Sequence, residues 1–388
     1  MRLTSHQGLD KILLFLLLMI PNMYTTSPFS LYGLQIILFG ILALYIVYRN
    51  KNFDLSILLI VLSLVAMLFA TSIYHVNYYS DLVYSGVDII IFKRLILCSF
   101  WAILSAFVVE YIFSFNRNDI TKILSLVIII PSLFIITQII VHYFFGFNFD
   151  FSIMTGGIPS RSYYGNYRPS GFMPEPAVYS GQMIALLALF LFFNKKINYA
   201  FIIGAISIFI SQSIAGILLL MLLTGSYILL FSSRKKIIYS LLGFGGVLIL
   251  ALPKLIERYQ LFISGKDASN NIKGDAIIHF MTNPDIYIFG YGIVGRDSPN
   301  LPSYYEALKD LTIFGSSLSI YGVIIGGLFC ILLIGLFYYS TLDFRIKIIL
   351  FIPLLKLCSP SYPLFWLYLC VVLKILLLTK CKENKKSI

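Results

Sequence analysis

Long unbroken apolar runs recur along the whole chain of 388 residues. A run of about 20 apolar residues can cross the hydrocarbon core of a bilayer as an α-helix. Hydrophobic residues make up 59% of the chain and charged residues 12%, whereas a soluble domain has about 25% charged residues. The apolar residues stand in blocks rather than alternating with polar ones, as the strands of an outer-membrane barrel would require. The sequence therefore predicts an all-α polytopic membrane protein and excludes a soluble enzyme.

Twelve apolar blocks are expected to form transmembrane helices within one integral membrane domain, 1–388. The blocks lie at about 11–27, 31–48, 55–73, 94–113, 122–144, 176–193, 199–213, 214–231, 237–252, 314–340, 348–358 and 363–379. Two long loops, 145–175 and 253–313, separate them. No small-residue cleavage site follows the first block, so we expect a retained helix broken near Pro21 rather than a cleaved signal peptide.

The net charge of +12 lies on one side of this predicted topology. Alternate loops, with the two termini, carry seventeen Lys and Arg against five Asp and Glu, while the remaining loops carry eleven of each. The positive-inside rule places the basic side in the cytoplasm. Both termini are then cytoplasmic, and both long loops lie outside. Because topology explains the charge, no nucleic-acid partner is expected.

The residue pattern predicts neither a metal site nor a nucleotide site. The five cysteines are scattered, the four histidines are isolated from one another, and no Asp-x-Asp pair occurs. A phosphate-binding loop of the G-x-x-x-x-G-K-[ST] type is also absent. We therefore expect no cofactor.

Polar residues are concentrated in the two external loops. The expected spans are nearly free of ionisable side chains, and Lys356 and Lys374 lie close enough to helix ends to extend toward the membrane surface. A transporter usually keeps polar groups near the middle of the bilayer instead. This distribution favours chemistry at the outer membrane face.

The stretch 168–181, R-P-S-G-F-M-P-E-P-A-V-Y-S-G, is the most informative part of the sequence. Its three prolines restrict the backbone, so Arg168 and Glu175 should be held in fixed positions. A helix is expected to begin near Pro176, since proline is favoured in the first turn. An alternative interpretation is that Glu175 only complements the helix dipole and that Arg168 binds lipid headgroups.

This R-P-S-G-F-x-x-E-P motif resembles the bacterial O-antigen polymerase and O-antigen ligase family, and three further motifs follow in the same order. They are S-Q-S-I-A-G at 211–216, N-P at 283–284 followed by F-G-Y-G at 289–292, and Asp310 followed by Y-G-V-I-I-G at 321–326. The His-Asn pair of many ligases is absent around Asp310, which favours a polymerase of the Wzy type. Gly322 and Gly326 are expected to permit close helix packing.

The resemblance implies a membrane glycosyltransferase of the C-type fold class in the bacterial inner membrane. Such an enzyme moves a growing glycan from undecaprenyl diphosphate onto the next lipid-linked repeat unit, without a metal or cofactor. Its partners would be lipid-linked oligosaccharides, the bilayer and a chain-length regulator protein. An O-antigen ligase is the nearest alternative, and a lipid-linked oligosaccharide flippase is an alternative from another class.

Candidate site residues follow from this reaction. Glu175 is the first candidate base for the acceptor hydroxyl and Asp310 the second, while Arg168 suits the diphosphate. Further candidates for substrate binding are Arg161, Arg258, Arg296, His279, Tyr163 and Tyr164. All of these except Arg161 have a structural alternative: interfacial anchoring for Arg258 and the two tyrosines, a local ion pair with Asp297 for Arg296, and packing for His279.

Overall fold

The computed structural model describes residues 7–23, 32–50, 53–78, 88–151, 167–173, 175–231, 268–292, 307–357 and 359–384 without position 361, with scattered positions in 253–265. Throughout these residues the secondary structure is helical. The chain divides into two compact units. Unit 1 comprises 1–54, 104–231 and 344–353, and unit 2 comprises 55–103, 232–343 and 354–388.

Most helices belong to a single unit. In unit 1 these are α1 (Gln7–Met19), η1 (Ile20–Asn22), α2 (Tyr32–Asn50), α5 (Arg117–Phe145), α7 (Pro176–Asn194), α8 (Tyr199–Ile210), α9 (Ile214–Phe231) and α14 (Phe344–Phe351). In unit 2 they are α3 (Leu55–Tyr78), α11 (Ala268–Thr282), α12 (Pro284–Phe289), η2 (Ala307–Lys309), α13 (Ile313–Tyr339) and α15 (Pro363–Asn384). Two elements, α4 (Asp88–Ser114) and η3 (Ile352–Leu355), contribute residues to both.

Six of the described helices are long and apolar enough to cross a membrane. They are 55–74, 95–114, 117–145, 176–194, 214–231 and 313–339, and each coincides with an expected span. Of the other expected spans, 31–48 and 363–379 fall on α2 and α15, and 11–27, 199–213 and 348–358 fall on shorter helices. The expected span 237–252 lies outside the described residues. The expected break near Pro21 is confirmed, because α1 ends at Met19 and a 3₁₀ turn contains Pro21.

Two expected spans are short helices. At 1.5 Å per residue, the 12 residues of α8 extend about 18 Å, less than the hydrocarbon thickness of about 30 Å. A turn at 211–213 joins α8 directly to α9, and the side chains of Ser211 and Ser213 are buried there. The block expected at 348–358 is likewise divided between the 8 residues of α14 and the 3₁₀ turn η3.

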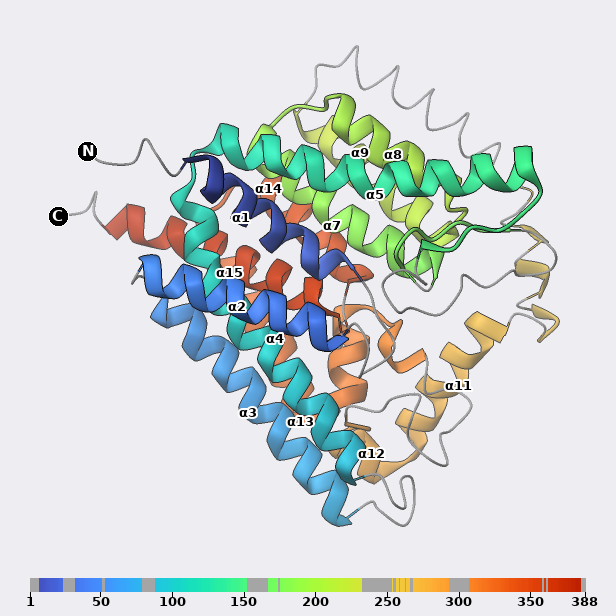
Figure 1. Cartoon of the computed structure of the whole chain (residues 1–388). Coiled ribbons are helices and arrows are strands. Elements are labelled where there is room, and N and C mark those ends of the chain that lie inside the picture. The colour runs from blue at the N-terminus through green and yellow to red at the C-terminus, as the bar shows by residue number, and fades with distance from the viewer. Residues whose placement is uncertain are drawn as a thin grey trace. The chain divides into compact units, whose positions relative to one another are not determined.

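Unit 1 is built around α7. Nearly all of its side chains are buried, because α5, α8, α9 and α14 all pack against it. Figure 1 shows α5 running alongside α7 and α8. Serine and tyrosine hydroxyls link these helices: Tyr179 and Ser207 are 2.7 Å apart, and Ser132 donates to Ser207 at 3.1 Å. Such small polar contacts are typical of helix interfaces in membranes.

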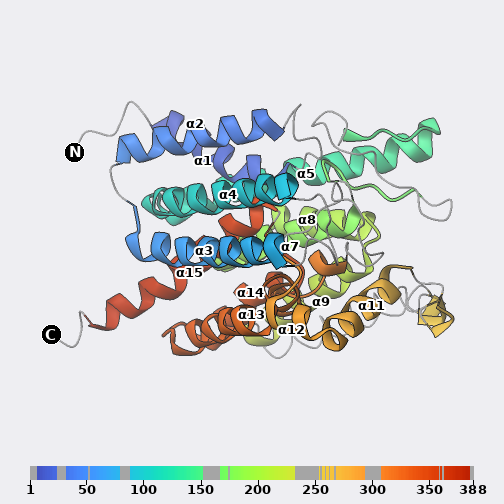
Figure 2. The same ribbon diagram turned by 90° about the horizontal axis from the view of Figure 1, so that it is seen from below.

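Unit 2 combines long helices with the helical part of the second loop. Helix α13 packs against α3 and α12, and α15 also packs against α3. Figure 2 shows α12 lying beside α13. A small apolar cluster, which includes Phe280, Ile286, Tyr291 and Leu308, joins α11, α12 and η2. The second loop is therefore a folded structure in its described part.

Candidate functional site

The segment carrying Arg168 is fixed by contacts with α5 in unit 1. The side chain of Gln138, which is fully buried, donates to the Phe149 carbonyl at 2.9 Å and accepts from the Gly171 amide at 2.8 Å. Gly171 has φ +62°, a left-handed conformation that glycine adopts without steric cost. One glutamine thus ties both described ends of the first long loop to the same helix.

Arg168 reaches the turn between α8 and α9. Its Nη2 donates to the Gln212 carbonyl at 2.9 Å, across 44 residues of sequence. Gln212 has φ +55°, which is uncommon for a residue with a side chain, and the bond from Arg168 stabilises this turn. The next residue, Ser213, accepts from Ser180 of α7 at 2.9 Å. The first two family-like motifs therefore contact each other directly.

Glu175 occupies the N-cap position of α7. Its backbone carbonyl accepts from the amides of Val178 and Tyr179, both at 3.1 Å, but its side chain makes no capping hydrogen bond. The side chain is half-buried. The helix dipole favours a carboxylate at this position, although the side chain does not cap the first turn by a hydrogen bond.

In unit 2, Gly322 interrupts α13. It has φ +74° and ψ 174°, so the helix is two segments that meet at this residue. The Ser319 and Ile320 carbonyls at the break accept the amides of Tyr291 and Gly292, at 2.7 and 2.9 Å. A Cβ on Gly322 would lie 2.0 Å from the Ile288 carbonyl oxygen. Gly322 thus permits the expected close packing, here between α13 and the end of α12, and its left-handed conformation also lets the backbone turn against 288–292.

A second group of charges surrounds Asp310. Its Oδ2 lies 2.6 Å from Nζ of Lys273, and its Oδ1 pairs with Nζ of Lys356. Burial raises the pKa of this carboxyl, but the charges of Lys356 and Lys273 outweigh that effect and hold the pKa below its ordinary value. A carboxylate with a depressed pKa is a weak proton acceptor. Asp310 is therefore better suited to holding two cations than to acting as the base.

Lys356 and Lys374, the two lysines expected to extend toward the membrane surface, have largely buried side chains. Lys356 pairs with Asp310, and its side chain is only 9% exposed. Lys374 is buried in the middle of α15, ten residues from the C-terminal end of that helix. The helix end expected near Lys374 lies further along the chain, because α15 continues to Asn384.

His279 contacts Tyr291 in unit 2. Its Nδ1 is hydrogen-bonded to the tyrosine hydroxyl, and the two rings stack with centroids 5.8 Å apart. Tyr291 is almost completely buried in the apolar cluster of unit 2. The contact stabilises this cluster, which is the structural alternative given for His279.

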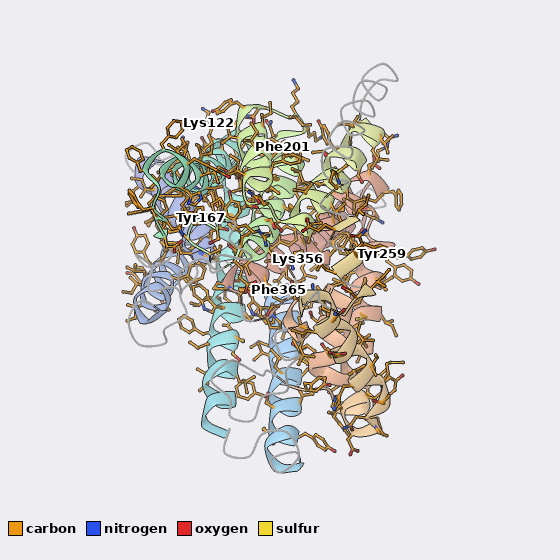
Figure 3. The ribbon with its side chains drawn as sticks, turned by 90° about the vertical axis from the view of Figure 1, so that its right-hand side faces the viewer. Lys122, Tyr167, Phe201, Tyr259, Lys356 and Phe365 are labelled. Atoms are coloured by element: carbon orange, nitrogen blue, oxygen red, sulfur yellow. The ribbon has the colours of Figure 1, made fainter. Side chains whose placement is uncertain are left out.

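The remaining sequence candidates lie outside the described residues. These are Arg161, Tyr163, Tyr164, Arg258 and Arg296. Beside Arg258, Tyr259 is 63% exposed and points away from the helices in Figure 3. No group of three or more His, Cys, Asp or Glu side chains suited to a metal ion occurs among the described positions.

Two groups that contact candidate residues were not expected from the sequence. They are Lys273, which pairs with Asp310, and the Gln212 carbonyl, which accepts from Arg168. Lys273 stands in a polar loop without a recognisable motif, and a backbone carbonyl leaves no trace in residue types. A signal did exist for Lys356, which is a charge inside an apolar block between Pro353 and Pro360. A lysine in such a place needs a partner or a route to water.

Comparisons with known proteins give no relative for this chain. No family model matches it, and neither a curated protein nor a solved structure does. Its function must therefore be argued from its own residues and their contacts.

Proposed function

We propose that this chain is a polysaccharide polymerase of the bacterial inner membrane. It would transfer a growing glycan from undecaprenyl diphosphate to the next lipid-linked repeat unit at the outer face. The proposal includes twelve membrane spans, cytoplasmic termini and external loops at 145–175 and 253–313. A chain-length regulator would be its protein partner.

The observation that carries the proposal is the contact between motifs. Arg168 of the first motif bonds to the turn 211–213 of the second. The Tyr291 amide of the third motif bonds to Ser319, two residues before the Y-G-x-x-G of the fourth. The resemblance rests on the order and spacing of the motifs and on topology, and the contacts between the motifs in space add support to it. Unrelated short matches would have no reason to pair in this way.

Further support comes from the ion pairs, which join residues expected on the same side of the membrane. Asp10 and Arg49 form a two-pronged ion pair, and Lys11 lies 2.8 Å from Asp119. All four belong to loops that the charge count assigns to the cytoplasm. Lys273 and Asp310, which pair in unit 2, both belong to a loop assigned to the outside. None of these ion pairs joins residues expected on opposite sides.

Glu175 and Arg168 have distinct roles in the proposed reaction. The acceptor hydroxyl oxygen attacks the anomeric carbon of the donor glycan, while its proton passes to the Glu175 carboxylate. The bond from that carbon to the diphosphate oxygen breaks, and the diphosphate leaves with the electron pair. The Arg168 guanidinium would stabilise the charge that develops on the leaving group, as a fixed cation in a dry site does efficiently.

The break in α13 also suggests the flippase alternative, because transporters place substrate and ion sites at interrupted helices. Such a site needs backbone groups at the break that can face a ligand. In this chain the Ser319 and Ile320 carbonyls already accept protein amides. The break thus holds part of the second loop, and it does not favour transport.

The test is elongation by the full chain in vesicles supplied only with undecaprenyl-diphosphate-linked repeat units. Polymerase activity predicts a ladder of longer lipid-linked glycans and release of undecaprenyl diphosphate, without nucleotide or ion gradient. Movement of the substrate between leaflets without new glycosidic bonds would indicate a flippase instead. In parallel vesicles that also contain lipid A–core, transfer to that acceptor alone would indicate a ligase.

The same assay tests independence from metals. Elongation should continue in EDTA, because an arginine can neutralise the leaving diphosphate in place of a divalent cation. A complete loss in EDTA that Mg²⁺ or Mn²⁺ restores would contradict this prediction. The control is EDTA saturated with Mg²⁺ before it is added.

A further inference from the structure

The C-terminal end of α5, in unit 1, runs into an exposed aromatic segment at 143–149. The segment reads Y-F-F-G-F-N-F, and every one of its residues is exposed. The exposed fraction of the aromatic residues runs from 40% at Phe149 to 81% at Phe144. Gly146 ends the helix with φ +72°, so the second half of the segment is irregular backbone. A dense group of aromatic side chains therefore lies on the surface just where a long helix stops.

The aromatic segment continues an exposed apolar face of α5. Leu126, Leu133 and Ile140 are all exposed and follow one another at intervals of seven residues, which places them on one face of the helix. Phe144 comes four residues after Ile140 and stays on that face. Because α5 is long and apolar enough to cross a membrane, this face is suited to contact with acyl chains. The aromatic segment is then the end of a lipid-facing surface.

The positions of the charged residues give the depth of the segment in a bilayer. Between Lys122 and Asp150 the chain contains no Asp, Glu, Lys or Arg. Counted from Lys122, the next 20 residues end at His142, and at 1.5 Å per residue they extend about 30 Å, the thickness of the hydrocarbon core. The aromatic segment therefore begins where the hydrocarbon ends, at the membrane face opposite Lys122.

Backbone and side chains of the segment agree on this depth. Irregular backbone exposed to lipid is not tolerated within the hydrocarbon, because its amides and carbonyls would lack partners. A contiguous group of exposed aromatic side chains is in turn unfavourable in bulk water. The headgroup region satisfies both requirements, since it supplies water to the backbone and apolar contact to the rings. Tyrosine and other amphipathic aromatic residues are enriched at this level of membrane proteins for that reason.

We propose that the aromatic segment 143–149 is an anchor that lies among the lipid headgroups of one leaflet. The anchor also carries the start of the first motif. The ring of His142 stacks on Tyr167, with centroids 4.6 Å apart, and the Tyr167 hydroxyl donates to the Phe149 carbonyl at 3.3 Å. Figure 3 labels Tyr167. Since Arg168 is the next residue, the anchor holds it near the headgroup level, and only the identity of the bound headgroup as that of the carrier lipid rests on the proposed function.

The test measures tryptophan fluorescence of the full chain in phosphatidylcholine vesicles whose acyl chains carry bromine either near the headgroup or near the methyl end. Bromine quenches tryptophan only at short range. The added emission of Phe144→Trp should be lost mainly with bromine near the headgroup. Leu133→Trp is the matched control, because it lies on the same face about 16 Å deeper and should show the reverse order. The unchanged chain, in which Trp101 and Trp366 are buried, provides the background.

Other positions of the segment give different results, and each overturns the proposal. Stronger quenching of Phe144→Trp by bromine near the methyl end would place the segment in the hydrocarbon. Quenching by aqueous iodide and by neither lipid would place it in water. Quenching by neither iodide nor lipid would mean that protein covers the segment, as in an assembly of two copies. Leu133→Trp unaffected by either lipid would mean that this face of α5 does not contact acyl chains.

Tyr167→Trp tests the link to the first motif. It should follow Phe144→Trp and lose more emission with bromine near the headgroup, whereas the reverse order would overturn the depth assigned to Arg168. Quenching needs no glycan, so this experiment is independent of the proposed reaction. Quenching at the headgroup level without elongation contradicts only the proposed polymerase, and elongation without such quenching contradicts only the anchor.

Discussion

At the scale of single residues, the sequence indicates which side chains could take part in a reaction, but not which other groups of the chain they contact. The proline-rich stretch was enough to predict that a helix begins at Pro176. It could not predict that Arg168 bonds to a carbonyl 44 residues away. In the same way, Asp310 was selected as a second base, but two lysines lower its pKa. A side chain's pKa depends on tertiary neighbours, which residue spacing does not reveal.

Glu175→Gln tests the base directly. The amide keeps the shape of the side chain but cannot accept a proton, so elongation should fall by about 10²–10⁴-fold at normal protein level. The measurement is the length of lipid-linked glycan formed in vesicles. Asp343→Asn is the control, because it removes a carboxylate from an exposed turn and should leave glycan length unchanged.

A purely structural role of Glu175 predicts a different result for the same variant. If the carboxylate only complements the dipole of α7, Glu175→Gln should cost about 1 kcal/mol or less and preserve long glycans. Long glycans in this variant would remove Glu175 from the mechanism. Asp310 would be a poor replacement as base, because its pKa is lowered by Lys273 and Lys356.

At the scale of helices, apolar run length predicts where helices lie but not where they are interrupted. The run 314–340 was expected as one span, and the structure has a helix there with Gly322 in a left-handed conformation. Nothing in an apolar run distinguishes a glycine that packs from one that breaks a helix. The difference is the backbone of 288–292, which lies against α13 and supplies the amides that its carbonyls need.

Gly322→Ala should destabilise unit 2, whereas Gly327→Ala on the same helix should not. An alanine at 322 requires a left-handed conformation and places Cβ 2.0 Å from the Ile288 oxygen. Strain and overlap together should cost at least about 2 kcal/mol of unfolding free energy. A Cβ on Gly327 meets nothing within 4 Å. Thermal unfolding in detergent compares the two variants, and equal midpoints would contradict the described break.

At the scale of the whole molecule, hydropathy predicts the fold class, and the distribution of charge predicts the orientation in the membrane. Apolar runs gave the all-helical membrane class, and six of them coincide with helices of membrane-spanning length. The alternation of charge gave an orientation, which remains a prediction. The short length of α14 could not be anticipated, because an apolar block does not reveal where an α-helix gives way to a 3₁₀ turn.

The predicted orientation can be tested across α13. Thr282 and Thr341 are both exposed, and the helix Ile313–Tyr339 lies between them. In intact spheroplasts, Thr282→Cys should react with an impermeant thiol reagent, because it belongs to the expected external loop. Thr341→Cys should react only after the membrane is opened, because its loop carries Arg345 and Lys347, part of the basic excess assigned to the cytoplasm.

The unsubstituted chain provides the background for this labelling experiment. Its Cys98, Cys330 and Cys370 are buried, so they should contribute little signal. The reverse labelling pattern would place the second loop in the cytoplasm, away from lipid-linked glycans presented outside, and would contradict the polymerase proposal as well as the topology. Equal labelling of both positions from outside would mean that α13 does not separate two sides of the membrane. Only labelling of Thr282→Cys alone leaves the second loop on the side where lipid-linked glycans are presented.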